Sequence, residues 1–315
     1  MKIKGKVKNL APSLLINIMA VTALFTVPLR TYQLVNIIEP QTGFYARYDI
    51  TILILYALIF VACLLFFLLS FIDGAMPAPN LPRGKNVFIG VSSAFLSITL
   101  LIDSIMQIDK LIALHNKYDL DFFELLYYLV KTGGMTALVQ AIFAILSAVY
   151  FSIFAISYLK GKEYYKTERV MALFPIIWGL CRAIQRFIEP IRFKNVSELL
   201  LQLFMLIFML VFFLSFARIA SQVNGEKSMW LLFASGLSAS LIAMTITVPS
   251  IIVMIMGKSS LLYSHYPVAF CDLFFAVFVV ALLLELVPSK LEIEQMNKSE
   301  VELIEQTEEK IEGVQ

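Results

Sequence analysis

Charged side chains are scarce in this 315-residue chain. Asp, Glu, Lys and Arg together make up 15% of it, whereas they make up about 25% of a typical soluble domain. Hydrophobic residues make up 60%, which is more than the core of a soluble protein can bury. The net charge is only +2, so the chain lacks the basic excess that indicates a nucleic-acid partner. These shortages exclude an ordinary soluble domain and indicate that the lipid bilayer is the main partner.

Residue types that carry common chemistry are also few. There are two histidines and three cysteines, and Cys63, Cys181 and Cys271 each lie inside an apolar run. The sequence contains no Cys-x-x-Cys pair, P-loop, HExxH or GxSxG motif. We therefore expect no enzyme, no catalytic or metal-ligating residues, no cofactor and no disulfide framework. The missing P-loop also argues against ATP-driven transport by this chain alone.

Long apolar runs dominate what is present. A helix needs about 20 apolar residues to cross a bilayer, and within lipid only helices or closed barrels satisfy every backbone polar group. The sequence therefore predicts an all-α integral membrane protein with about eight transmembrane helices. The eight runs are 10–29, 50–72, 87–107, 135–159, 168–189, 197–221, 229–256 and 268–287.

Lysine and arginine predict the orientation of these helices. If the N-terminus is inside, most of the 25 basic residues fall on the cytoplasmic side, as positively charged loops do. With an even number of crossings, both termini are cytoplasmic, and the protein is a multi-pass component of the cell membrane. One local exception is a basic group on the outer side, made of Arg182, Arg186, Arg192 and Lys194.

Two stretches of the chain resemble each other. Residues 21–40 read VTALFTVPLRTYQLVNIIEP and residues 170–190 read VMALFPIIWGLCRAIQRFIEP. Both contain V-x-A-L-F, then R-x-x-Q, then I-E-P, with small gaps between these motifs. An internal duplication would make a parallel 4+4 repeat, an arrangement known in transporters. Chance similarity of apolar segments is the alternative.

The duplication defines the expected domains. Residues 1–160 form the first four-helix half and residues 161–288 the second. The first half includes an outer amphipathic segment at 116–134, either a lid or a helix lying in the headgroups. Residues 289–315 form an acidic cytoplasmic tail, which is a candidate binding site for a partner protein.

A polar stripe interrupts the apolar sequence at 182–189. Arg182, Gln185, Arg186 and Glu189 recur at i, i+3, i+4 and i+7, which is one face of a helix. A charge at mid-membrane costs from about 2.5 kcal/mol upward, so such a stripe faces protein or water. The expected topology places further polar residues at a similar outer depth, which predicts an outward-open polar cavity. These residues are Arg30, Gln33, Asp103, Gln107, Gln140, Gln202 and Asp272.

We interpret the stripe and these other residues, apart from Gln140, as substrate-binding positions of a secondary transporter or channel for a small polar or anionic solute. Convergence of Arg30, Arg182 and Arg186 would favour an anion, because guanidinium groups match carboxylate and phosphate. The same arginines could instead pair with carboxylates and only hold helices together. The nearly pure apolar inner halves and the acidic tail favour a sensor or accessory subunit of a membrane complex. An intramembrane enzyme is a third reading, without an obvious nucleophile.

We expect the two termini to be cytoplasmic and position 195 to lie outside. The variants Asn195→Cys and Glu300→Cys test this with a membrane-impermeant thiol reagent on intact cells. Labelling at 195 and not at 300 fits the topology, since the reagent reaches only outer residues. Labelling at 300 but not at 195 would reverse it. The unmodified chain is the control for its own cysteines.

Overall fold

The structure is a computed structural model whose described part is almost entirely helical. The segment that contains Glu189, the 288–315 tail and the first ten residues lie outside the described part. The structure describes residues 11–39, 45–71, 81–82, 84–118, 121–132, 134–166, 169–188, 196–223, 225–258, 261–262 and 270–287.

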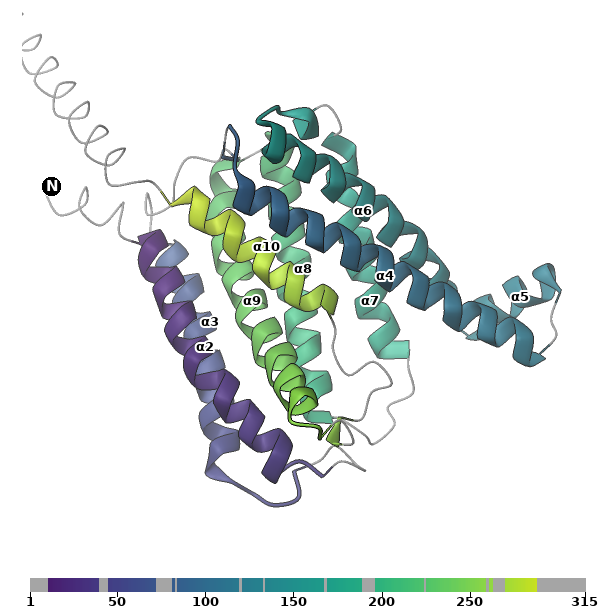
Figure 1. Cartoon of the computed structure of the whole chain (residues 1–315), viewed down its shortest axis with the longest axis horizontal. Coiled ribbons are helices and arrows are strands. Elements are labelled where there is room, and N and C mark those ends of the chain that lie inside the picture. The colour runs from purple at the N-terminus through teal and green to yellow at the C-terminus, as the bar shows by residue number, and fades with distance from the viewer. Residues whose placement is uncertain are drawn as a thin grey trace, which may run out of the picture.

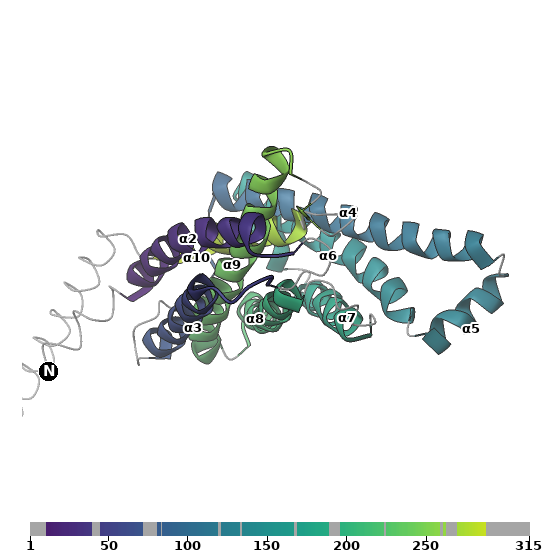
Figure 2. The same ribbon diagram turned by 90° about the horizontal axis from the view of Figure 1, so that it is seen from below.

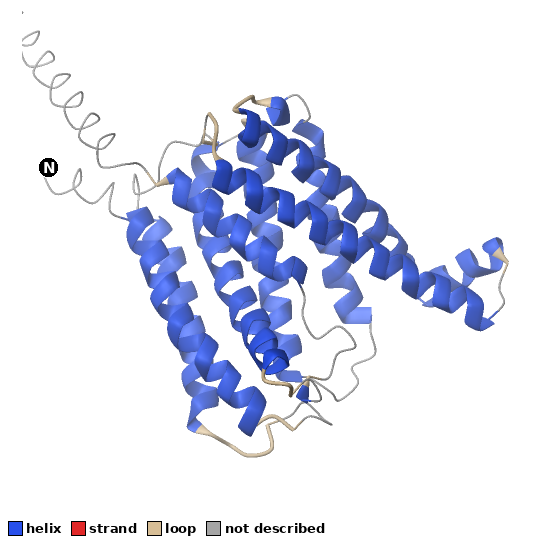
Figure 3. Cartoon of the chain, in the orientation of Figure 1, coloured by secondary structure: helices blue, strands red, loops and turns tan. Residues whose placement is uncertain are grey.

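Successive long helices run up and down the bundle (Figure 1). Among the described residues there is no strand, and only an isolated bridge joins Ile38 and Tyr45 (Figure 3). The helices are α2 (Ala11–Asn36), α3 (Ile50–Phe71), α4 (Val87–Tyr118), α5 (Phe122–Thr132), α6 (Met135–Lys160), α7 (Phe174–Ile188), α8 (Val196–Ala220), α9 (Gly225–Ile255) and α10 (Phe270–Leu286), with short 3-10 turns η1 (Tyr164–Lys166) and η2 (Arg169–Leu173).

Within the described residues, seven helical segments are long and apolar enough to cross a membrane, which supports a multi-pass membrane protein. The eighth predicted run coincides with α10, whose described part has 17 residues. At 1.5 Å per residue this part is about 25 Å long, short of the roughly 30 Å of a hydrocarbon core. The count of eight spans therefore stays a prediction.

Local polar groups fix where several helices begin and end. The Asp49 carboxylate accepts a hydrogen bond of 2.9 Å from the backbone N–H of Thr51 at the start of α3, and this bond lowers the pKa of Asp49 below its ordinary value. Asn86 accepts a 2.9 Å bond from the N–H of Ile89 and caps α4 in the same way. Gly161 ends α6 in the left-handed conformation, at φ 69°, which glycine adopts without strain.

Helix α9 is the central helix of the bundle. It packs against α2, α3, α8 and α10, and every residue from Leu232 to Ala243 is buried. Small residues in this stretch let neighbouring helices approach closely, and Ser238 and Thr245 donate to carbonyls one turn back. Helices α2 and α3 pack against each other and join the rest chiefly through α9.

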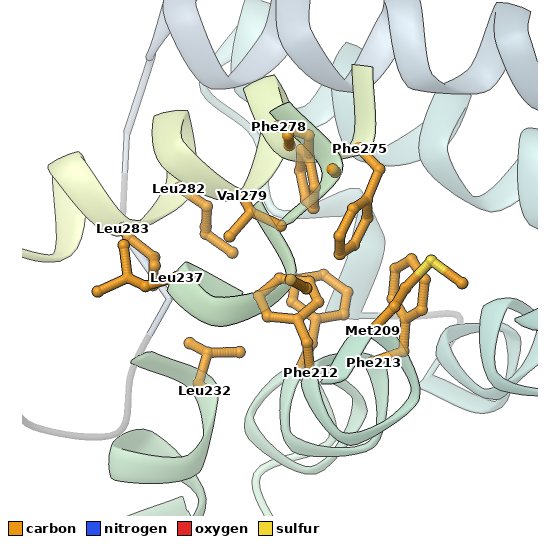
Figure 4. Close-up of a cluster of buried hydrophobic side chains, with 14 of the residues drawn as sticks. Met209, Phe212, Phe213, Leu232, Leu237, Phe275, Phe278, Val279, Leu282 and Leu283 are labelled. Atoms are coloured by element: carbon orange, nitrogen blue, oxygen red, sulfur yellow. The ribbon is translucent and has the colours of Figure 1, made fainter. Parts of the chain in front are cut away.

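An aromatic core fills the bundle beside α9 (Figure 4). Ring centroids lie 5.3 Å apart for Phe213 and Phe275, and 5.2 Å apart for Phe151 and Phe278, distances typical of favourable aromatic pairs. These rings join α6, α8 and α10 into one block. The aromatic core consists of Phe151, Phe154, Phe212, Phe213, Phe216, Phe275 and Phe278, none of them more than 1% exposed.

The predicted amphipathic segment 116–134 is divided between two helices. Helix α4 continues to Tyr118, beyond the end of its apolar run at 107, and α5 follows it. Both views place α5 at the far end of the arm that α4 forms (Figure 2). Its exposed apolar residues Phe123, Tyr127 and Val130 lie on one face. The contrast between a lid and an interfacial helix stays open.

The parallel repeat also stays a prediction. In a 4+4 repeat, α2 corresponds to α7. The extensive partners of α2 are α3 and α9, whereas those of α7 are α6 and α8. Only the pairing with the next long helix in the chain is shared by the two.

Gly236 on α9 tests the packing of the aromatic core. A Cβ at this position would lie 2.9 Å from Phe212 Cδ2 and 3.0 Å from Val279 Cγ1. Such overpacking costs about 1–3 kcal/mol, which outweighs the roughly 1 kcal/mol that alanine gains over glycine in a helix. Gly236→Ala should therefore lower the melting temperature of the purified protein in detergent.

Gly179 provides the matched control. A Cβ there meets only the flexible ends of Leu210 and Met209, at 3.2 and 3.3 Å. Gly179→Ala should leave the melting temperature unchanged or raise it. Equal melting temperatures for the Gly236 and Gly179 variants would contradict the close contact at Gly236.

Candidate functional site

A largely buried ion pair joins α7 to α10. Arg182 donates from Nη1 to Asp272 Oδ1 at 2.6 Å and from Nη2 to Asp272 Oδ2 at 3.1 Å. The Arg182 side chain is 13% exposed and the Asp272 side chain 4%. This two-pronged geometry is the strongest form of an arginine–carboxylate contact. Arg182 thus has an acidic partner on another helix, which offsets the cost of placing a charged side chain within the bilayer.

Asp103 on α4 lies beside this pair and brings in a third and a fourth helix. Its Oδ2 accepts one hydrogen bond of 2.9 Å from Gln140 Nε2 and another of 2.8 Å from Trp178 Nε1. The Arg182 guanidinium carbon lies 5.0 Å from the centre of the Trp178 ring, within range of a cation–π contact. We call Asp103, Gln140, Trp178, Arg182 and Asp272 the polar network.

Helix register brings these side chains together. Ser97 donates to the carbonyl of Ala148 at 2.7 Å, and Ser104 donates to the carbonyl of Ala141 at 3.0 Å. These two bonds align α4 and α6 antiparallel, which places Asp103 opposite Gln140. On α7, Trp178 and Arg182 are four residues apart and share one face.

The polar network has more negative than positive charge. Two carboxylates, Asp103 and Asp272, face one guanidinium. Both terminal nitrogens of Arg182 are bonded to Asp272, and Asp103 is held by two neutral donors. The arrangement therefore does not present a free guanidinium fork to an anion.

Arg30 belongs to a second polar cluster. Its Nη1 donates to Gln33 Oε1 at 3.3 Å and to the Tyr45 hydroxyl at 3.2 Å, and Gln33 Nε2 donates to the carbonyl of Thr51 at 2.9 Å. Helices α2 and α3 lie at the opposite side of the bundle from α7 in both views (Figures 1 and 2). The structure therefore does not bring Arg30 and Gln33 together with Arg182.

The other predicted positions are scattered around the polar network. Gln107 is buried on α4, one turn beyond Asp103. Gln185 and Arg186 are half-buried on α7. Gln202 donates to Glu198 on its own helix at 3.2 Å, and Glu189 lies outside the described residues.

Sequence reasoning missed Trp178, which contacts both charged parts of the polar network. A usable signal was present, because Trp178 lies one helical turn before Arg182 in an apolar run, where an indole N–H needs a partner. Asp103 was predicted, but its contact with Gln140 and Trp178 depends on helix register.

The aromatic core borders the polar network on one side. Trp178 contacts Phe213, with ring centroids 6.4 Å apart, and Phe275 follows Asp272 by one turn on α10. From there the rings continue toward the ends of α6, α8 and α10. Aromatic side chains thus pack the interior of this helix group next to the polar network.

Comparison with protein families, curated proteins and solved structures gives no match to this chain. Among the described residues, no group of three His, Cys, Asp or Glu side chains is placed to hold a metal ion. The fold and the hydropathy define a class, that of multi-pass helical membrane proteins. Within this class, the polar network is the candidate functional site.

A double-substitution test measures how the ion pair contributes to stability. Arg182→Gln or Asp272→Asn alone leaves one buried charge without its partner, which costs about 3–5 kcal/mol. Each single variant should therefore melt at a clearly lower temperature in detergent. The double variant has no uncompensated charge at this pair and should recover much of that loss.

Arg218→Gln on α8 is the control, because Arg218 is exposed and its loss should leave the melting temperature nearly unchanged. A double variant whose loss equals the sum of the two single losses would show that the two charges are not energetically coupled.

Proposed function

We propose that this protein is a secondary transporter or channel for a small polar solute, with the polar network as its solute site. The observation that supports it is the ion pair of Arg182 and Asp272 together with the additional carboxylate of Asp103, held between four helices. Ionisable residues inside a bilayer are costly and usually mark a substrate or ion pathway.

Structural pairing alone is a weaker explanation of Asp103. One cation and one anion suffice for an ion pair that holds α7 to α10. Asp103 adds a second negative charge, although a neutral asparagine could accept the same bonds from Gln140 and Trp178. A residue that served only helix adhesion would not need the extra charge, since desolvating it opposes folding.

The geometry favours a polar solute over an anionic one. An anion at Arg182 would have to displace Asp272 from both terminal nitrogens. Arg30 cannot assist there, because it belongs to the second polar cluster on α2. A solute with hydrogen-bond donors, by contrast, meets the carboxylate and amide oxygens that line the polar network.

The aromatic core supports a second candidate, a sensor or accessory subunit of a membrane complex. Seven buried rings of α6, α8 and α10 form the aromatic core, which borders the polar network. A transporter must open a path through or around them, whereas a sensor needs only a change of shape when a ligand binds. The two functions differ in whether solute crosses the bilayer.

Uptake by the purified protein in liposomes tests transport. A panel of labelled sugars, amino acids, amines and carboxylates is offered to vesicles with and without the protein. We expect one polar class to accumulate, and Asp103→Asn should lower its initial rate by about tenfold or more, equal to 1.4 kcal/mol or more in the barrier.

Asp109→Asn provides the matched control, since Asp109 is an exposed carboxylate on the same helix and should retain the full rate. Equal rates in the Asp103 and Asp109 variants would contradict the proposed site. Ligand binding without accumulation of any solute would favour the sensor.

A further inference from the structure

Two buried oxygens near Asp103 have no hydrogen-bond donor. Among the described residues, no donor reaches Gln140 Oε1 or Gln107 Oε1. Gln140 is 1% exposed and Gln107 6%. A buried carbonyl oxygen without a donor is costly, and such atoms in a folded protein call for an explanation such as a bound ion.

The Gln140 amide cannot be turned to remove this deficit. Its Nε2 donates to the Asp103 carboxylate at 2.9 Å. The reversed amide would place Oε1 against a carboxylate, which also only accepts hydrogen bonds. Asp103 therefore fixes the orientation of the amide, and Oε1 belongs to a side chain that is bonded directly to the Asp103 carboxylate.

Gln107 adds an oxygen on the same face of α4. It follows Asp103 by four residues, about one turn or 5.4 Å along the axis. The hydrogen bonds to Asp103 from described residues both fall on Oδ2. Asp103 and Gln107 on α4 and Gln140 on α6 thus place three oxygen-bearing side chains along the contact between these two helices.

We propose that the polar network binds one monovalent cation at the oxygens of Asp103, Gln107 and Gln140. This inference rests on the proposed function in one respect, since it uses the same site. It adds the class of ligand that binds there. A cation satisfies all three oxygens and also balances the second carboxylate. Hard oxygen donors are the ligands that alkali cations and ammonium groups share.

The charge of the polar network selects a single positive charge. Arg182 already neutralises Asp272, which leaves the charge of Asp103. A monovalent cation makes the site neutral, whereas a divalent ion would leave a buried positive charge. Ca²⁺ also takes six to eight oxygens, often from several carboxylates, and this site offers one carboxylate.

Trp178 makes the site observable by fluorescence. Its indole N–H donates to the Asp103 oxygen at 2.8 Å, so a cation on Asp103 changes the field at the ring. The chain has two tryptophans, and the other, Trp230, packs against Phe71 with ring centroids 5.5 Å apart. Trp230→Phe therefore leaves Trp178 as the single reporter.

The experiment titrates the purified Trp230→Phe protein in detergent at fixed pH. Sodium, potassium and methylammonium chloride each replace choline chloride at constant ionic strength. We expect a saturable change in Trp178 emission with at least one of the three small cations and none with choline. The three salts distinguish an alkali cation from an ammonium group.

Variants locate the bound cation. Gln107→Leu leaves the hydrogen bond of the Trp178 indole to Asp103 in place and should weaken the apparent affinity for the cation by about tenfold or more. Asp103→Asn should abolish the change in Trp178 emission. Asp109→Asn should titrate as the parent does. Because Asp103→Asn alters the reporter's own partner, the Gln107 variant decides the case if the Asp103 variant does not fold.

Two results would overturn the cation site. One is emission that is identical in all four salts, and the other is an unchanged affinity in Gln107→Leu. A separate titration of pH in choline chloride shows whether Asp103 takes up only a proton, which would also overturn it. Cation binding without solute uptake would support the cation site and contradict transport. Solute uptake without a cation response would support transport and contradict the cation site.

Discussion

The ion pair between Arg182 and Asp272 is the constraint on which the interior of this protein depends. Lipid offers no hydrogen bonds to a guanidinium, so the arginine must find a carboxylate or water within the protein. Asp272 supplies both bonds at once and thereby fixes the rotation of α7 and α10 about their axes. Trp178 then lies where its ring meets the guanidinium and its N–H meets Asp103. One charge that lipid cannot accommodate thus ties α7 to α10 directly and contacts α4 through Trp178 and Asp103.

The aromatic core and the polar network divide the same helices between two kinds of packing. In the aromatic core, contacts are numerous and need no particular direction. In the polar network, each contact is directional, and a small shift breaks a bond that water cannot replace. Helix α10 contributes to both the polar network and the aromatic core. Asp272 lies in its first turn, and Phe275 and Phe278 follow about one and two turns later. Any movement of α10 therefore disturbs the polar network before it disturbs the core.

Much of the architecture could be predicted because lipid imposes a length on apolar segments. Hydropathy, however, shows which part of a helix lies in the bilayer and not where the helix ends. The run at 87–107 therefore did not indicate that α4 continues to Tyr118. The expected depth along the helices placed Asp272 at a level similar to that of Arg182, and the structure joins the two in an ion pair. Depth could not show that Arg30 lies across the bundle, because helix adjacency depends on contacts between distant segments.

The role of Asp103 was hidden for a similar reason. Its partners depend on the register of α4 against α6, which hydroxyl bonds such as Ser97 to Ala148 fix over a separation of 51 residues. In the sequence, Trp178 looks like one more residue of an apolar run. Only its position one helical turn before Arg182 indicates its polar contacts. The polar stripe at 182–189 could be recognised in the sequence because charged residues are rare in this chain. The neutral residues that hold it in place could not be recognised, because such residues are common.

The central position of α9 has a consequence for the order in which the chain assembles. Helices α2 and α3 are made first, yet they join the bundle chiefly through α9, the seventh of the candidate spans. Ribosomes add about 5–20 residues per second, so the interval between the end of α3 and the end of α9 is roughly ten to forty seconds. During that time the first hairpin lies in the membrane with its docking face against lipid. Helix α3 is suited to contact with lipid during this interval, since it is apolar all round. The hydroxyl-rich α9 then joins α2 and α3 to α8, and α10 is made after it.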